Sequence, residues 1–218
     1  MSSSEFEFQR RRMVEDQLRA RDIRDERVLQ AMARVPRERF VPEQLRLRAY
    51  DDAALPIGEG QTISQPYMVA FICETLALSG TERVLDVGAG SGYRAAVLAD
   101  LASEVHSIER LPELAERARA NLDAAGYADR VQVHVGDGTL GDPKHAPFAA
   151  IAVAAAAPEL PPSLYEQLEP NGRLVLPVGS RRGQELQLVV RSPDGPAIVR
   201  SVPCRFVPLV GEEGFESD

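Results

Sequence analysis

The feature that most constrains this chain is a run of alternating glycines that follows a short apolar segment. Residues 85–92 read Leu-Asp-Val-Gly-Ala-Gly-Ser-Gly, directly after Arg83 and Val84. An apolar run, a glycine turn and then a helical pattern over Arg94–Leu101 predict a strand–loop–helix unit of the kind that binds nucleotides. Glycine suits such a turn because a backbone without a Cβ can approach a ligand closely.

An acidic residue ends the next strand-like run. Glu109 closes the segment Val105–Glu109 and lies about 20 residues after Gly88. A carboxylate at this place can accept hydrogen bonds from both hydroxyls of a ribose. A solvated acid at the start of a helix is the simpler alternative, but the spacing from Gly88 favours the ribose.

The glycine spacing separates two classes of nucleotide site. A dinucleotide fold uses G-x-G-x-x-G, and counted from Gly88 the last position of that pattern is Tyr93. The chain instead has G-x-G-x-G, which is typical of S-adenosylmethionine-dependent methyltransferases. The pattern therefore disfavours an NAD-dependent oxidoreductase, and a glycine-rich turn without a ligand is the other alternative.

Strand-like and helix-like segments alternate from Arg83 onward. This alternation predicts an α/β fold with a mainly parallel sheet and helices on both faces. Together with the glycine spacing, it leads us to expect a Rossmann-like fold of the class I S-adenosylmethionine-dependent methyltransferase type. The last segments have no helix between them, so we expect an antiparallel C-terminal edge. The expected strands are 84–87, 105–109, 131–135, 148–155, 173–178, 185–191, 198–202 and 204–210, and the expected helices are 94–101, 112–125 and 160–168.

The chain before Arg83 has a different character. Residues 10–20 and 26–34 read as helices, whereas residues 55–66 are turn-rich and too polar to be core. We expect this part to lie over the carboxyl edge of the sheet, where open α/β folds bind ligands. Residues 1–218 are thus interpreted as a single methyltransferase domain, with a helical, substrate-side extension over 1–80 and a cofactor-binding core over 81–218.

Composition limits the partners. The formal net charge of −8 argues against general nucleic-acid binding. Cys73 and Cys204 form no disulfide framework, and the three histidines stand apart from them, so no metal site is expected. No signal peptide or stretch of membrane-spanning length is evident. We expect a cytoplasmic monomer without nucleic-acid or membrane partners.

A second motif resembles a specific family. Residues 60–70 read Gly-Gln-Thr-Ile-Ser-Gln-Pro-Tyr-Met-Val-Ala, which looks like the signature of the protein-L-isoaspartate (D-aspartate) O-methyltransferases. Further matches follow in the order of that family and cover nearly the whole chain, at 35–42, 55–58, 85–93, 107–110, 136–138, 146–148, 171–179 and 205–209.

The resemblance implies S-adenosyl-L-methionine as cofactor, S-adenosyl-L-homocysteine as its product, and roles for the matched positions. Ser64 resembles the active-site serine, Glu109 would hold the ribose, and Asp137 with Gly138 would meet the adenine. The implied cofactor contacts are Gln61, Thr62, Ile63, Ser64, Asp86, Gly88, Ala89, Gly90, Gly92, Glu109, Arg110, Asp137 and Gly138. The implied substrate contacts are Ile63, Ser64, Tyr67, Phe206, Val207, Pro208 and Leu209.

Some of these positions have structural alternatives. Ser64 precedes Pro66 and a helical run, so it could be an N-cap. Asp137 could be a turn residue between two glycines. Several positions depart from the common pattern of the family, and they bear on substrate preference and rate more than on cofactor binding. They are Tyr67, Asp86, Ala149, Ala154 and the region of Leu140, where the usual tryptophan is absent.

The expected activity is methyl transfer to the free carboxylate of L-isoaspartyl residues in damaged proteins and peptides, with D-aspartyl residues left open as substrates. Repair would then proceed through a succinimide. A carboxylate is already ionised at pH 7, so Ser64 is expected to orient it rather than to act as a nucleophile. One alternative is methylation of a normal aspartate in a dedicated peptide, which the short sequence after Val210 disfavours. The other is a non-catalytic cofactor-binding relative.

Overall fold

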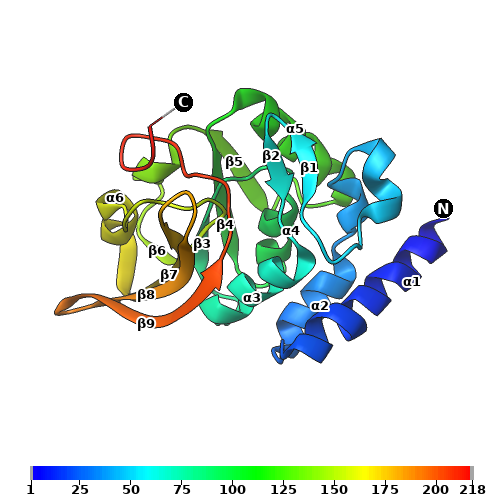
Figure 1. Ribbon diagram of the computed structural model, residues 1–218, viewed down its shortest axis with the longest axis horizontal. Coiled ribbons are helices and arrows are strands. Elements are labelled where there is room, and N and C mark those ends of the chain that lie inside the picture. The colour runs from blue at the N-terminus through cyan, green and yellow to red at the C-terminus, as the bar shows by residue number, and fades with distance from the viewer. Residues whose placement is uncertain (1, 217–218) are drawn as a thin grey trace.

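A seven-stranded sheet forms the centre of the computed structural model, which describes residues 2–216 (Figure 1). Five neighbouring strands are parallel, and the last two add an antiparallel edge in the order β5-β4-β3-β6-β7-β8-β9. Their bounds are β3 Arg83–Val87, β4 Glu104–Glu109, β5 Val131–Val135, β6 Phe148–Val153, β7 Leu168–Gly179, β8 Gln184–Ser192 and β9 Gly195–Cys204. The predicted fold class and its antiparallel C-terminal edge are confirmed.

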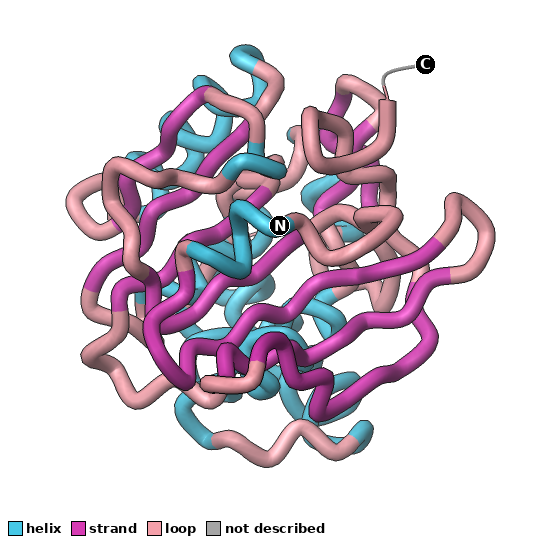
Figure 2. Tube along the Cα trace, turned by 90° about the vertical axis from the view of Figure 1, so that its left-hand side faces the viewer, coloured by secondary structure: helices cyan, strands magenta, loops and turns pink. Residues whose placement is uncertain are grey.

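Helices cover both faces of this sheet, because successive strand residues point to opposite sides. Val84, Val105 and Val131 face one large core, to which α3 (Pro66–Leu76), α4 (Tyr93–Ala99) and α5 (Pro112–Ala125) contribute. Leu85, Ile108 and Ile151 face a second core, closed by α6 (Pro162–Glu166). Figure 2 views the molecule from the antiparallel edge, with the strands in magenta.

The N-terminal helices form a further layer outside α3 and α4. Helix α1 (Ser3–Met13) runs into a π-helical segment (Val14–Leu18), and α2 (Glu26–Arg34) follows after a short 3-10 turn. Met13, Leu18 and Met32 are fully buried in the same core as α3 and α4. In Figure 1 these helices lie on the side of the molecule away from β8 and β9.

The segment from 55 to 63 differs from the sequence expectation. It forms a two-stranded hairpin, β1 (Leu55–Gly58) and β2 (Gln61–Ile63). Leu55, Ile57 and Ile63 are each buried in the main core, so the expectation that this stretch is too polar for core was wrong. Alternation along the strands explains the outcome, because Leu55, Ile57 and Ile63 point inward while Pro56 and Thr62 between them are exposed.

Two other expected elements are shorter than the sequence indicated. The predicted helix 160–168 is reduced to α6, because β7 already begins at Leu168. The predicted strand 204–210 does not form: β9 ends at Cys204, and residues 205–210 cross the end of β6 with a single bridge between Ala156 and Pro208. Proline at 208 lacks the N–H that a continuous ladder requires. No helix within residues 2–216 is long and apolar enough to span a membrane.

Candidate active site

Two adjoining cavities open at the carboxyl ends of β3, β4 and β6. The first, of about 120 Å³, is lined by the glycine loop and the end of β4. The second, of about 570 Å³, is lined by Ser64, the start of α3 and the segment after β9. Four residues belong to both walls, namely Thr62, Ala154, Val207 and Pro208. A ligand in the first cavity therefore meets a ligand in the second across this shared wall.

The glycine loop between β3 and α4 forms the floor of the smaller cavity. Gly88 has φ 86°, a left-handed conformation that favours glycine, and a Cβ there would lie 3.2 Å from that of Ala154. Gly90 also lines the cavity, but Ala89 does not. Gly92, at φ 88°, faces α5: an added Cβ would meet the Ala118 carbonyl oxygen at 3.2 Å. Gly92 therefore does not line the smaller cavity, and its missing side chain lets the glycine loop pack against α5 behind the cavity wall.

Glu109 ends β4 at the edge of the same cavity and is 8 % exposed. One carboxylate oxygen accepts the Gly90 N–H at 2.9 Å, and the other accepts the Leu111 N–H at 3.1 Å. The acid therefore fixes the glycine loop while presenting its remaining lone pairs to the cavity. Arg110, the next residue, is exposed and also lines this cavity.

Asp86 lies beneath the loop rather than in its wall. Its side chain is fully buried, with one oxygen 2.5 Å from Arg94 Nε and the other accepting the Ser107 hydroxyl at 2.7 Å. Arg94 continues the network to the Val87 carbonyl at 3.0 Å. Asp86 was expected at the cofactor; the structure assigns it to a buried ion pair that holds β3, α4 and β4 together.

The turn after β5 brings Gly138 into the cavity but directs Asp137 elsewhere. An added Cβ on Gly138 would lie 2.7 Å from Val87 Cγ1, so only glycine fits against β3. The Asp137 carboxylate accepts the Thr139 N–H at 2.8 Å and the Glu212 N–H at 2.8 Å. Asp137 thus makes the contacts of a turn residue, and its carboxylate also anchors the C-terminal segment.

Residues 61–64 run along both cavities. Gln61 and Thr62 line the smaller one, and Thr62 and Ser64 line the larger one. Ile63 points into the core and lines neither. The capping alternative for Ser64 was wrong, because Gln65 is the N-cap of α3 and caps it with its backbone only. Within residues 2–216 the Ser64 hydroxyl has no hydrogen-bond partner, so it is available to a ligand.

The segment after β9 supplies the opposite wall. Phe206, Val207 and Pro208 line the larger cavity, whereas Leu209 lies over the smaller one. The Ala156 N–H donates to the Val207 carbonyl, and the Leu209 N–H donates back to Ala156, both at 2.7 Å. These two bonds fix the segment across the end of β6.

Sequence reasoning missed several lining residues of the larger cavity, among them Arg181 and Gln184. Arg181 and Arg205 bring two positive charges to the larger cavity. Gln184 clamps Phe206, accepting its N–H at 2.6 Å and donating to its carbonyl at 3.1 Å. No motif marks Arg181 or Gln184, because they reach the site only through the pairing of β7 with β8, whereas Arg205 lies in the matched stretch 205–209. Tyr67, expected at the substrate, packs instead beneath Arg21, whose guanidinium lies 3.8 Å from the ring centre.

The geometry agrees with the comparisons to known proteins. The sequence profile of the protein-L-isoaspartate(D-aspartate) O-methyltransferase (PCMT) family matches residues 9–214. The chain is 58% identical to the protein-L-isoaspartate O-methyltransferase 2 of Marinobacter nauticus over 94% of both chains. It is 53% identical to the protein-L-isoaspartate O-methyltransferase of Hyperthermus butylicus, over 96% of this chain and 92% of that one.

Two solved structures have similar folds. One is a protein-L-isoaspartate O-methyltransferase with a TM-score of 0.83 at 28% identity, covering 94% of this chain and 67% of that one. The other, from Plasmodium falciparum, is a putative member of this class in complex with S-adenosyl-L-homocysteine, with a TM-score of 0.80 at 26% identity over 92% of this chain and 98% of that one.

Proposed function

This chain belongs to the protein-L-isoaspartate (D-aspartate) O-methyltransferase family, and we propose from this premise that it methylates isoaspartyl residues of damaged proteins and peptides. The methyl donor is S-adenosyl-L-methionine, and the acceptor is the free carboxylate of the isoaspartyl residue. The observation that carries the proposal is the pair of cavities with a common wall, one walled by the glycine loop and Glu109, the other by Ser64 and two arginines.

The smaller cavity has the features that an adenosine-containing cofactor requires. Gly88 and Gly90 bring bare backbone to the wall, Glu109 offers carboxylate oxygens for ribose hydroxyls, and Gly138 leaves a flat surface against β3. We assign Gln61, Thr62, Gly88, Gly90, Glu109, Arg110 and Gly138 to direct cofactor contact. When bound, the cofactor supplies a methyl group already activated by a sulfonium.

The larger cavity has the features that a peptide carboxylate requires. Arg181 and Arg205 attract a negative charge, although both are exposed and partly screened by water. Ser64 donates its hydroxyl hydrogen to one carboxylate oxygen and so points the other oxygen across the shared wall. No strong base is needed, because a carboxylic acid of pKa about 4 is ionised at pH 7.

Rate enhancement comes from alignment and from the removal of water around the carboxylate. Val207 and Pro208 supply an apolar surface at the meeting point of the two cavities, and Ala154 adds only a methyl group there. The carboxylate oxygen attacks the methyl carbon, and the carbon–sulfur bond breaks as the carbon–oxygen bond forms. The released ester then cyclises in solution as the next backbone nitrogen displaces methanol, which gives the succinimide.

We further infer the domain organisation, partners and location of this chain. We propose a single functional domain, because residues of 1–80 share the main core with the sheet and line both cavities. We also propose that the chain acts as a monomer. The two cysteines within the described residues are free, which supports a reducing cytoplasm. The net charge of −8 supports the absence of a nucleic-acid partner.

The decisive experiment uses labelled S-adenosyl-L-methionine and two synthetic peptides that differ only in an aspartyl or isoaspartyl linkage. Methylation confined to the isoaspartyl peptide is the expected result. Methylation of the normal peptide would favour an enzyme of peptide maturation. If neither peptide is methylated although the cofactor binds, the repair function is wrong for this chain.

A further inference from the structure

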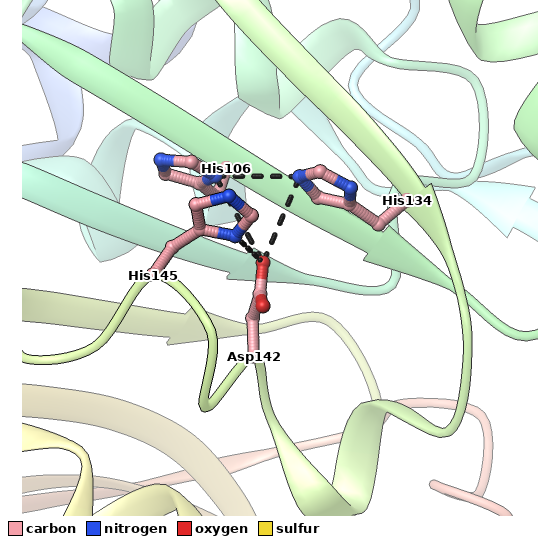
Figure 3. Close-up of side chains that lie close together, drawn as sticks. All are labelled: His106, His134, Asp142 and His145. Atoms are coloured by element: carbon pink, nitrogen blue, oxygen red, sulfur yellow. Dashed lines mark hydrogen bonds and ion pairs between the residues drawn. The ribbon is translucent and has the colours of Figure 1, made fainter.

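All three histidines of the chain lie at one place on the sheet, together with Asp142 (Figure 3). His106 lies in β4 and His134 in the edge strand β5, whereas Asp142 and His145 lie in the loop between the turn after β5 and β6. One ligand atom from each of the four residues lies within 4.8 Å of all the others. The cluster lies apart from both cavities of the active site, because none of its members lines them.

The separations between these atoms suit one shared ion. His106 Nδ1 lies 3.3 Å from His134 Nε2, and the Asp142 Oδ2 atom lies 3.6 Å from His134 Nε2 and 3.8 Å from His106 Nδ1. His145 Nδ1 lies 2.8 Å from the same oxygen. A tetrahedral ion with bonds of about 2.0–2.1 Å places its ligand atoms about 3.3 Å apart. These four separations lie on both sides of that value, and the remaining pairs, which lie within 4.8 Å, would have to shorten on binding.

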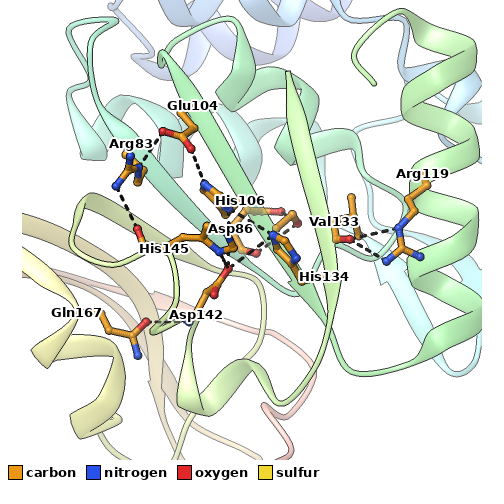
Figure 4. A network of polar contacts seen from close by, with 11 residues as sticks. Arg83, Asp86, Glu104, His106, Arg119, Val133, His134, Asp142, His145 and Gln167 are labelled. Atoms are coloured by element: carbon orange, nitrogen blue, oxygen red, sulfur yellow. Dashed lines mark hydrogen bonds and ion pairs between the residues drawn. The ribbon is translucent and has the colours of Figure 1, made fainter. Parts of the chain in front are cut away.

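The buried histidine is oriented by a second layer of charged groups (Figure 4). His106 Nε2 lies 2.8 Å from Glu104 Oε1, and the other oxygen of Glu104 lies 2.8 Å from Arg83 Nε. An ionised carboxylate only accepts, so Nε2 carries the proton and the lone pair of Nδ1 faces His134 and Asp142. A carboxylate behind a ligating histidine is the usual support of a metal site.

One side of the cluster is buried in the protein, and the other side is partly exposed to solvent. His106 is fully buried, and Asp142 is held through its backbone N–H, which donates to Gln167 at 2.8 Å. The side chains of His134 and His145 are about one-third exposed. The His106 and His145 rings are stacked, with centroids 4.2 Å apart. The partly exposed side chains of His134 and His145 leave a route from solvent to the ligand atoms.

We propose that His106, His134, His145 and Asp142 bind one divalent transition-metal ion, for which Zn²⁺ is the best match. Three imidazoles and one carboxylate supply four protein ligands, which leaves no open position of the kind that catalytic zinc keeps. Each imidazole would bind the ion through one ring nitrogen and keep a hydrogen on the other. The bound ion joins β4, the edge strand β5 and the loop before β6, and so stabilises this corner of the sheet.

The test uses the untagged full chain, freed of metal with a chelator and titrated with Co²⁺ as a coloured probe. We expect one equivalent to produce the intense visible absorption of a tetrahedral site, Zn²⁺ to displace it, and Zn²⁺ to raise the midpoint of thermal unfolding. Since the chain has no other histidine, any histidine-dependent binding comes from this cluster.

Three variants separate ligation from other effects. His134→Gln and His145→Gln change part-exposed side chains, and each should weaken Co²⁺ binding at least ~10-fold while the far-ultraviolet circular dichroism stays unchanged. Cys204→Ser is the matched control and should bind like the parent. Absence of stoichiometric Co²⁺ and Zn²⁺ binding, or binding as tight as that of the parent in both histidine variants, would show that the cluster is a hydrogen-bonded packing unit and would overturn the proposal.

Discussion

The guanidinium of Arg37 donates a hydrogen bond to the backbone carbonyl of Ser64 at 2.8 Å, across 27 residues of sequence. Arg37 is fully buried, and its Nε also donates to the Ala49 carbonyl at 2.7 Å. Its guanidinium carbon lies 4.8 Å from the centre of the Tyr93 ring, at the start of α4. One buried side chain thus ties the residue proposed to orient the substrate to the helix after the glycine loop.

Arg37→Lys should therefore lower the turnover number without much change in the affinity for S-adenosyl-L-methionine. A lysine ammonium cannot reproduce the planar fork that reaches both carbonyls. Leaving one buried carbonyl unpaired should also reduce the free energy of unfolding by about 1–3 kcal/mol. Steady-state kinetics and urea denaturation measure the two effects, and an unaltered turnover number would contradict the positioning role.

Ser64→Ala should reduce methyl transfer by ~10-fold or more, on the scale of one lost hydrogen bond to a charged group. The affinity for S-adenosyl-L-homocysteine, measured by calorimetry, should stay within a factor of about two because Ser64 does not line the smaller cavity. Ser201→Ala, on the exposed edge strand β9, is the matched control. A Ser64 variant that loses cofactor affinity as strongly as activity would argue against this division of roles.

Glu109→Gln should weaken cofactor binding, because the amide cannot accept hydrogen bonds at both positions while facing the Gly90 and Leu111 N–H groups. We expect the dissociation constant of S-adenosyl-L-homocysteine to rise ~10-fold or more. At saturating cofactor the turnover number should recover much of its value. Failure to recover would place Glu109 in the methyl-transfer step itself.

Asp137→Ala should loosen the C-terminal segment. Its carboxylate accepts the Glu212 N–H, and Thr139, which it orients, accepts the Glu213 N–H at 3.1 Å. Amide hydrogen exchange at 212 and 213 should accelerate, while exchange in β3 and β4 stays slow. Glu213→Gln, which alters the contacts of this segment with Ser163, is the companion variant. Unchanged exchange at 212 would mean that other contacts hold the segment.

The two thiols should differ from ordinary cysteines in reactivity. Burial raises the pKa of Cys73 to about 12, and burial followed by the charge of Glu185 raises that of Cys204 to about 11. Iodoacetamide at pH 8 should therefore label Cys73 only after unfolding.

The same raised thiol pKa values make the stability of the fold depend on pH. The protonated thiols contribute their full stabilisation below the ordinary thiol pKa of about 8.5, and this stabilisation is lost as the pH rises toward 12. Peptide mass spectrometry and denaturation at several pH values measure the two effects.

Sequence reasoning predicted the parallel sheet, the glycine loop and the position of Glu109, because these depend on local periodicity and spacing. It did not place Arg181 and Gln184, which reach the larger cavity only through the pairing of β7 with β8. It also missed the meeting of His106, His134 and His145. Those residues come from two strands and a loop, and only the lateral order of the sheet brings them together.

The wall formed by Thr62, Ala154, Val207 and Pro208 has a consequence for how such an enzyme can diverge. These four residues face both the larger cavity, proposed for the methyl-accepting peptide, and the smaller cavity, proposed for the methyl-donating cofactor. Any substitution that reshapes the acceptor side of this wall therefore also reshapes the donor side, so peptide selectivity and cofactor affinity are not independent traits. A lineage that acquires a new peptide preference through Val207 or Pro208 must compensate elsewhere. By contrast, Arg181, Arg205 and Met68 lie on the acceptor side alone, and changes there are the freer route to new specificity.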